Sequence, residues 1–433
     1  MISTNKMTIF KKFFVLFLFI ALIMSVTGCS PTAPTAPTVP TATQTPIVEA
    51  TTIPPTETPL PTATATPFVP KATIKIVSQA PASTDIAHAA ELAVEQLQGS
   101  VNNLGYKVEF VPYDDQQKID VAITNAKQIV KDPQVLCGVG HYNSPIMIQA
   151  SQVYHAAGLA FISPSSTNPS VTDSGYLEVN RVIGRDDGEG IAAAQFIQAQ
   201  GYKSVYIFSA TNGYAQSFVP TLKQELGSLG IKIVGVTTTD ITSNFQSIVS
   251  KVMAANPDVI YYSGSADQGG PFFNEARAEG YKGPFLSMSN LDDSSVVTLA
   301  GPFLTDGGGM YYTQSAAPAS AYPDAQKFAQ DFQIKYGASP QWYAAQAYDA
   351  AGICLKAIEE ASKAKGGDLP TRAEVAQAIR ALKDYKGITG TYNFNKNGDL
   401  VPAKYFVFKV MTLDPNNWGQ NTIVATFNVE PPK

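Results

Sequence analysis

Short apolar runs alternate with segments of helical periodicity along most of the chain. In the first part the apolar runs are 73–77, 107–111, 136–139 and 159–162, and the helical segments between them are 87–97, 119–131 and 145–155. Strands that alternate with helices in this way build a parallel sheet with helices on both faces. The pattern therefore predicts an α/β lobe that contains a β-loop-α-β-loop unit around residues 136–169.

A second series of the same kind follows. Its apolar runs are 204–208, 231–236, 259–262 and 284–287, and its helical segments are 218–229 and 245–255. The chain then continues with a predicted strand at 309–313, helices at 325–336, 346–363 and 372–382, and strands at 404–408 and 423–427. The expected fold class is α/β, with two Rossmann-like lobes of parallel sheet joined by several strands that form a hinge.

The N-terminus is predicted to be a secretion signal. Three lysines precede the apolar run 13–24, and small residues then lead to Cys29. This order is typical of a signal peptide, and the run Val26 to Cys29 resembles the bacterial lipobox, which would make Cys29 the lipidated first residue after removal of residues 1–28. An uncleaved transmembrane helix is the alternative, but the apolar run is shorter than the ~20 residues that a bilayer span needs.

Residues 29–70 are expected to form a linker. They are almost entirely Pro, Thr, Ala and Val, and such a composition cannot build a core. An extended polyproline II segment of this kind spans up to ~3 Å per residue. It would hold the following domains away from the outer face of the cell membrane, to which the lipid on Cys29 anchors them.

Charge and cysteine content limit the partners. The chain has 30 Lys and Arg against 35 Asp and Glu, and three of the lysines lie in the predicted signal. An acidic mature chain argues against nucleic acid as a partner. Apart from Cys29, the cysteines are Cys137 and Cys354, which we expect to be unpaired core residues because they are far apart in sequence.

Two hydroxyl-rich loops are the clearest candidates for chemistry. The first is 141–145 and the second is 163–169, and each follows an apolar strand. In open α/β sheets, ligands collect at the carboxyl ends of strands, where helix N-termini and short donors meet an anion. Ser144 before Pro145 can cap its helix, bind a ligand or do both. The second loop has more hydroxyls than a cap requires, which favours binding.

Several motifs resemble the leucine/isoleucine/valine-binding family of type I periplasmic binding proteins. They are Tyr113–Gln116, Gly140–His141, Ala150–Ser151, Gly158–Pro169, Arg181, Asp186–Gly190, Tyr261–Gly264, Ala347–Ala350, Gly387–Gly390 and Asn397–Asp399. The resemblance implies a two-lobed clamp with three crossovers that passes a small solute to an ABC permease. Lobe 1 would consist of 71–185 and 313–404, and lobe 2 of 186–312 and 405–433.

The resemblance also implies a carboxylate site. In the family, a serine after the Gly-His strand end binds the ligand carboxylate, and a triplet of Ala or Ser, Ala or Ser, and Thr follows at the next strand end. The matching residues here are Ser144, Ser165, Ser166 and Thr167. Short donors suit this role because a buried carboxylate without partners costs several kcal/mol. The Ser165 carbonyl would accept from a ligand ammonium, and Tyr214 would close the site from lobe 2.

Lobe 2 departs from the family pattern. Ser289 stands where an acid is expected to pair with the ammonium, and Ser265 stands where a tyrosine is expected. Asp292, Asp293 or Asp267 could supply the missing charge if the loop is shifted. A ligand without an ammonium, such as an amide, urea or an organic acid, is the alternative.

No motif indicates catalysis, a cofactor or a metal. The three histidines lack the spacing of a zinc site, no Gly-x-Ser-x-Gly elbow occurs, and Gly138–Gly140 lacks the third glycine of a dinucleotide loop. His141 is expected to be a structural hydrogen-bonding residue. The sequence therefore predicts a monomeric, lipid-anchored solute-binding protein of an ABC importer. A ligand-sensing receptor and a surface hydrolase are the alternative functions.

Overall fold

The computed structural model describes residues 69–432, which belong to one compact unit. The first sheet is parallel throughout and has the strand order β2-β1-β3-β4-β5. Its strands are β1 (Ala72–Gln79), β2 (Tyr106–Tyr113), β3 (Val135–Gly140), β4 (Ala160–Ser163) and β5 (Val179–Arg181). The predicted β-loop-α-β-loop unit is confirmed.

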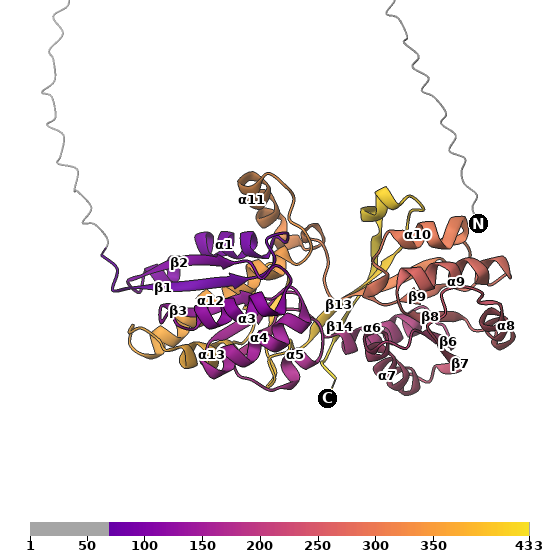
Figure 1. Cartoon of the computed structure of the whole chain (residues 1–433), viewed down its shortest axis with the longest axis horizontal. Helices are drawn as coiled ribbons and strands as arrows, with labels where there is room; N and C mark the ends of the chain where they lie inside the picture. Colours follow the sequence, from indigo (N-terminus) through magenta and orange to yellow (C-terminus); the bar gives the residue numbers. More distant parts are fainter. Residues whose placement is uncertain (1–68, 433) are drawn as a thin grey trace, which may run out of the picture. The chain divides into compact units, whose positions relative to one another are not determined.

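Helices cover both faces of this sheet. They are α1 (Ile86–Leu97), α2 (Gly99–Asn102), α3 (Ile119–Ile129), α4 (Ser144–Ala156), α5 (Ser170–Asp173), α12 (Ala344–Ala364) and α13 (Arg372–Ala381), and α11 (Gln326–Tyr336) packs outside α1. Successive side chains of β1 point to opposite faces, so Ile76 packs with α1 and α12 while Val77 packs with α3 and α4. Figure 1 shows α1 beside β1 and β2.

The second sheet has the order β14-β13-β10-β9-β8-β6-β7. Its strands are β6 (Ser204–Ser209), β7 (Lys232–Thr238), β8 (Val259–Ser263), β9 (Phe285–Ser287), β10 (Met310–Gln314), β13 (Ala403–Lys409) and β14 (Thr422–Val429). The strands β6 to β10 are parallel, whereas β13 and β14 are added antiparallel at one edge. The predicted α/β class with parallel sheets is confirmed, and the tail makes the second sheet mixed.

The helices of the second sheet are α6 (Asp186–Ala199), α7 (Gly213–Ser228), α8 (Gln246–Ala255), α9 (Ala266–Ala278) and α10 (Ser295–Ala300). Short elements complete the described chain: η1 (Ser289–Leu291), η2 (Gly301–Phe303), η3 (Ala319–Ala321), η4 (Pro323–Ala325), η5 (Pro415–Gln420), β11 (Tyr385–Lys386) and β12 (Thr391–Tyr392). The chain passes between the two sheets after β5, after β10 and before β13, so three crossovers connect them.

The helix α6 was not predicted from periodicity. Its first turn is pressed against β13: a Cβ added at Gly188 would lie 2.1 Å from the hydroxyl of Tyr405, which itself donates to the carbonyl of Arg185 at 2.8 Å. A glycine is required where a side chain approaches the backbone this closely. The helix is therefore fixed at its N-terminal end, next to a crossover.

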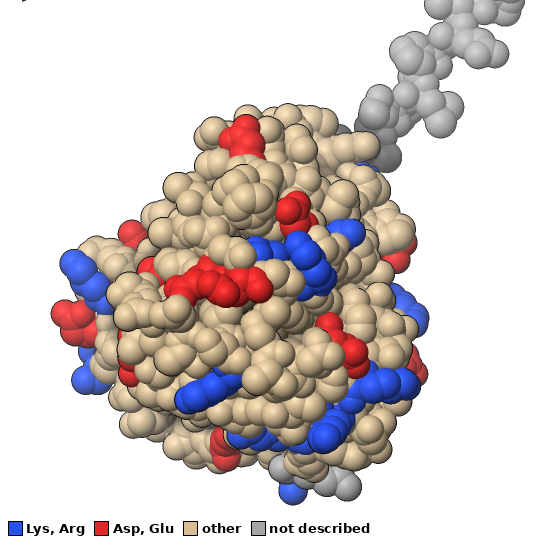
Figure 2. All heavy atoms as spheres, turned by 90° about the vertical axis from the view of Figure 1, so that its right-hand side faces the viewer, with Lys and Arg blue, Asp and Glu red and all other residues tan. Residues whose placement is uncertain are grey.

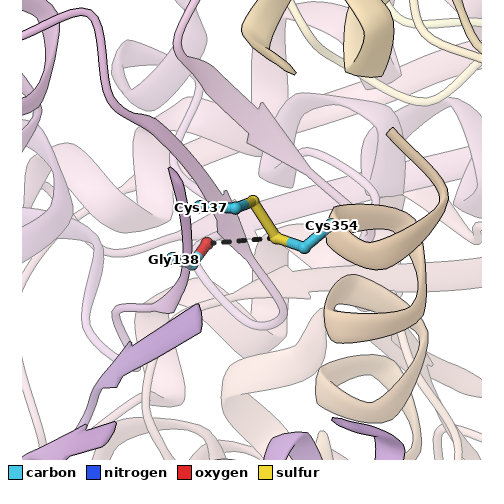
Figure 3. The surroundings of a disulfide bond; sticks show 3 residues. All are labelled: Cys137, Gly138 and Cys354. Carbon is cyan, nitrogen blue, oxygen red and sulfur yellow. Dashed lines mark hydrogen bonds between the residues drawn. A yellow bond between two sulfur atoms is a disulfide. The ribbon is translucent and has the colours of Figure 1, made fainter. Parts of the chain in front are cut away.

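The expectation that Cys137 and Cys354 are unpaired is wrong. They form a disulfide between β3 and α12, with their Cα atoms 5.8 Å apart, and the Cys354 Sγ lies next to the carbonyl of Gly138 (Figure 3). Sequence distance misled the prediction, because the chain returns to the first sheet after the second one and lays α12 across β3. A disulfide fits an oxidising, extracytoplasmic location.

Several predictions concern residues that the structure does not describe. The signal segment 1–28, the lipidation site Cys29 and nearly all of the linker 29–70 lie outside the described residues. Within 69–432, no helix combines the length and the apolar character that a bilayer crossing needs. On the face drawn in Figure 2, basic and acidic side chains lie in small groups among mainly uncharged residues.

Candidate ligand-binding site

Two loops meet at the carboxyl edge of the first sheet. One connects β3 to α4, and the other, residues 164–169, follows β4. The hydroxyl of Ser144 accepts a hydrogen bond from the backbone N–H of Asn168 at 3.2 Å. Ser144 is the first residue of α4, and Asn143 before it is the N-cap residue. The interpretation of Ser144 as the cap is therefore wrong by one position, and its hydroxyl serves the loop contact instead.

The carbonyl of His141 lies within hydrogen-bond distance of three serine hydroxyls, one at the end of β4 and two in the second loop. Ser163 and Ser166 each donate to it at 3.1 Å, and the Ser165 hydroxyl lies 3.2 Å from it and 3.0 Å from the carbonyl of Tyr142. These hydrogen bonds fix the conformation of the loop. His141 is fully buried, with Nδ1 2.8 Å from the carboxylate of Asp115. Burial lowers the pKa of His141, and Asp115 opposes this.

A buried arginine fixes the second loop from the opposite side. Arg181 donates to the carbonyls of Ser166 at 2.9 Å and Asn168 at 3.0 Å. Its charge is balanced by Asp399, whose Oδ1 lies 3.0 Å from Nε. Burial lowers the pKa of Arg181, and Asp399 opposes this. The loop conformation therefore depends on an ion pair that links β5 to a segment more than 200 residues later in the chain.

Some polar groups of the two loops are not used internally. Among the described residues, no hydrogen bond occupies the backbone N–H of Ser144, the backbone N–H of Thr167 or the carbonyl of Ser165. The hydroxyl of Ser144 acts only as an acceptor toward Asn168. The loops thus offer two backbone donors and a hydroxyl donor, which suit a carboxylate, and one carbonyl acceptor.

The second sheet contributes Tyr214 and Ser289. The hydroxyl of Tyr214, in the first turn of α7, lies 3.2 Å from that of Ser289 at the start of η1. Ser265 precedes α9 as its N-cap residue and donates to the carboxylate of Asp267. Two of the predicted lobe 2 residues are therefore in contact, while the hydroxyl of Ser265 is paired locally.

Both carboxylate oxygens of Asp292 already accept hydrogen bonds from other residues. Its Oδ1 accepts from the indole N–H of Trp418 at 2.7 Å, and its Oδ2 accepts from the amide of Gln314 at 3.0 Å. Burial raises the pKa of Asp292, and these donors oppose the rise. Asp293 accepts from the backbone N–H of Ser295 at 2.8 Å. Both oxygens of Asp292 thus tie η1 to β10 and to η5.

Two buried acids that the sequence analysis did not select lie in the first turn of α6. Asp186 donates its backbone N–H to the carbonyl of Thr167 at 2.9 Å. Three residues later, Glu189 Oε2 accepts from the backbone N–H of Ser289 at 3.0 Å and from the hydroxyl of Thr313 at 2.9 Å. The motif 186–190 pointed to this place, but only as part of the family resemblance.

Both acids hold protons unusually tightly. Burial raises the pKa of Asp186 to about 6, and the neighbouring Thr167 hydroxyl opposes the rise. Burial also raises the pKa of Glu189 to about 8, and the charge of Asp186 adds to this, while Thr313 and Ser289 oppose it. Two carboxyl groups that share one helix turn in a buried environment cannot both ionise without cost.

A tyrosine on the first-sheet side was also missed. Tyr343 precedes α12 with a backbone φ of 69°, and its ring lies 5.9 Å from that of Tyr142 in an edge-on arrangement. Burial raises the pKa of Tyr343, and the charges of Tyr142 and Glu189 add to the rise. Tyr343 is therefore close enough to the acids of α6 to sense their charge.

Other features lie away from these residues. A cavity of about 460 Å³ is lined by crossover residues such as Val182, Leu400 and Lys404, and another of about 380 Å³ is lined by His88 and Tyr113 among others. Within the part of the chain that the structure describes, no group of three or more His, Cys, Asp or Glu side chains is placed to hold a metal ion.

Comparison with known proteins gives matches over most of the chain. A family model described as periplasmic binding protein matches residues 78–413. An amino acid binding protein of Pseudomonas aeruginosa is 28% identical over 327 residues, which are 74% of this chain and 83% of that protein. The Leu/Ile/Val-binding protein homolog 1 of Brucella suis is 28% identical over 329 residues, which are 75% of this chain and 85% of that protein.

Solved structures are similar as well. The crystal structure of an ABC transporter substrate-binding protein from Desulfitobacterium hafniense in complex with Leu has a TM-score of 0.65 and 25% sequence identity, covering 81% of this chain and 100% of that one.

Proposed function

This chain belongs to the periplasmic binding protein family, and we propose that within this family it is the solute-binding lipoprotein of an ABC importer for a small carboxylate-bearing solute, namely a branched-chain or related amino acid. The resemblance to the leucine/isoleucine/valine-binding group is confirmed by the family match and by relatives with that name. Members of the family bind solutes and are not enzymes.

The unused donors at the ends of β3 and β4 carry the proposal. Ser144 and Thr167 offer N–H and hydroxyl groups within two loops that touch through Asn168. A carboxylate bound there would replace its water with short, neutral donors, and this avoids a competing counter-ion. Tyr214 and Ser289 would close over the solute from the second sheet.

The clamp would work by population shift. In this proposal lobe 1 comprises 71–185 and 313–404, and lobe 2 comprises 186–312 and 405–433. A solute that contacts both lobes binds the closed form more tightly than the open form, so binding favours closure about the three crossovers. ABC permease subunits would recognise the closed form, and the protein would act as a monomer.

The proposed location rests on the sequence of the N-terminal segment. Removal of 1–28 and lipidation of Cys29 would anchor the protein to the outer face of the cell membrane, with 29–70 as a tether. The β3–α12 disulfide supports an extracytoplasmic location, because cytosolic proteins rarely hold such bonds.

One observation favours a second ligand class. Ser289 stands where an acid would pair with an ammonium, and both oxygens of Asp292 are occupied by Trp418 and Gln314. A solute without an ammonium, such as an organic acid, an amide or urea, would need no acid at that place.

Calorimetric titration separates these possibilities. The chain from Pro67 onward, which contains the compact unit, would be titrated with leucine, isoleucine and valine, with isocaproate and isoamylamine as deaminated and decarboxylated leucine, and with urea. Binding of the amino acids alone supports the amino-acid function. If isocaproate or urea binds more tightly than leucine, the natural solute belongs to the class without an ammonium. If no compound of the panel binds, the proposed function is contradicted.

A further inference from the structure

The first turn of α6 connects the two halves of the candidate site. At one end, the backbone N–H of Asp186 binds the carbonyl of Thr167 at 2.9 Å. At the other, Glu189 binds the backbone N–H of Ser289 at 3.0 Å, and Ser289 contacts the hydroxyl of Tyr214. Glu189 is thus hydrogen-bonded directly to Ser289, the residue that stands where an acid is expected.

Glu189 is a buried acid with one carboxyl oxygen that makes no hydrogen bond. Its side chain has no exposed surface, and its Oε2 takes both of its hydrogen bonds. Its Oε1 has no hydrogen-bond partner among the described residues. A buried carboxylate oxygen without a donor costs several kcal/mol. The helix turn therefore holds an acceptor that a cation or a strong donor would satisfy.

The nearby arginines do not supply that cation. Arg181 pairs with Asp399, and Arg185 pairs with Asp187, Asp173 and Asp399. No ion pair within residues 69–432 includes Glu189. When Glu189 is ionised, no cationic side chain of the described chain is paired with it.

We propose that Glu189 receives the ammonium group of the bound solute and so takes the part of the acid that is absent at Ser289. The inference rests on the proposed amino-acid function. The carboxylate of the solute would lie on the donors of Ser144 and Thr167, and the ammonium would lie toward the first turn of α6, next to Ser289.

Proton binding couples to this arrangement. The titratable groups that act on Glu189 or sense its charge are Asp186 on α6, Tyr214 on α7, Tyr261 on β8, Tyr405 on β13 and Tyr343 before α12. Burial and Asp186 raise the pKa of Glu189 to about 8, so the free protein carries a proton there at pH 7. An arriving ammonium favours the ionised form, and this proton is released to solvent.

Two measurements on the chain from Pro67 onward test the inference. Leucine and isocaproate would be titrated into the wild type, E189Q and D186N. In E189Q we expect leucine affinity to fall about a hundredfold, since a charge-assisted contact is lost, while isocaproate affinity stays within about twofold of the wild type. Equal losses for both ligands, unchanged leucine binding in E189Q, or a larger selective loss in D186N would overturn the inference.

The second measurement uses the wild type alone, and it does not depend on the folding of a variant. The enthalpy of leucine binding at pH 7 would be compared in buffers of different ionisation enthalpy. We expect release of about one proton per leucine, whereas no release would overturn the inference. If the wild type binds isocaproate but not leucine, the assignment of the carboxylate site is supported and the proposed ammonium-binding role of Glu189 is wrong. If it binds neither, the proposed function itself has failed.

Discussion

The pH dependence of stability gives a direct test of the buried acid on α6. The pKa of Glu189 rises from 4.5 to about 8 on folding, mainly through burial. Between these values the unfolded chain has released the proton that the folded protein keeps, so stability falls as pH rises. Replacing Glu189 by Gln removes this dependence, keeps an acceptor for Ser289 and Thr313, and leaves the side-chain volume unchanged.

The size of the effect follows from the linkage relation. Asp186 has a pKa of about 6, so it contributes mainly below that pH and Glu189 dominates above it. From pH 6 to pH 8, a single group with folded and unfolded pKa values of about 8 and 4.5 lowers the free energy of unfolding by about 2 kcal/mol. The stability of E189Q relative to the wild type is therefore expected to increase by about 2 kcal/mol over this range.

Urea unfolding followed by tryptophan fluorescence at pH 6, 7 and 8 measures this difference without ligand. Titrating groups that do not interact with Glu189 contribute equally to both proteins and cancel, and the coupled Asp186 contributes mainly near pH 6. E279Q, which changes an exposed acid at the end of α9, is the matched control and should show a constant difference from the wild type. A difference between E189Q and the wild type that does not change with pH would refute the buried-acid reasoning.

Three further results are expected. Arg181→Met leaves buried Asp399 with Arg185 as its one remaining arginine partner and releases two loop carbonyls, so the free energy of unfolding should fall by about 3–5 kcal/mol in urea titrations; an effect below about 1 kcal/mol would contradict the role of this ion pair. Reduction of the β3–α12 disulfide should lower the unfolding free energy by about 2–5 kcal/mol, measured with and without reductant. The double variant Ser144→Ala with Thr167→Ala should abolish calorimetric binding of isocaproate and leucine alike, and unchanged affinity would refute the assignment of the carboxylate site.

Local pattern predicted most of the fold because the strands and helices repeat their own periodicities. The run 136–139 lies within β3, and the segment 346–363 lies within α12. The pattern failed at α6 and α9, where the helices contain glycines and, in α9, Pro271. At Gly188 the reason is the close approach of Tyr405, a residue from the last part of the chain.

Only part of the candidate site could be predicted from the sequence, for the same reason. The pairing of Ser144 with the second loop follows from two strand ends that are neighbours in one sheet. The Cys137–Cys354 disulfide and the Arg181–Asp399 ion pair join residues separated by more than 200 positions. No local pattern encodes such contacts, since they depend on how the chain returns to the first sheet.

The missing acid shows how far a local search can mislead. Asp292 and Asp293 follow Ser289 closely in sequence, and they were the natural substitutes for the acid expected there. The structure uses both for other contacts, whereas the carboxylate that reaches the backbone of Ser289 belongs to Glu189, 100 residues earlier. A helix that begins at a crossover, packed between a lobe 1 loop and η1, can bring an acid to the site from a position that sequence proximity would never select. Under the proposed function, specificity would depend on the residues at the start of α6 as well as on the loops at the strand ends.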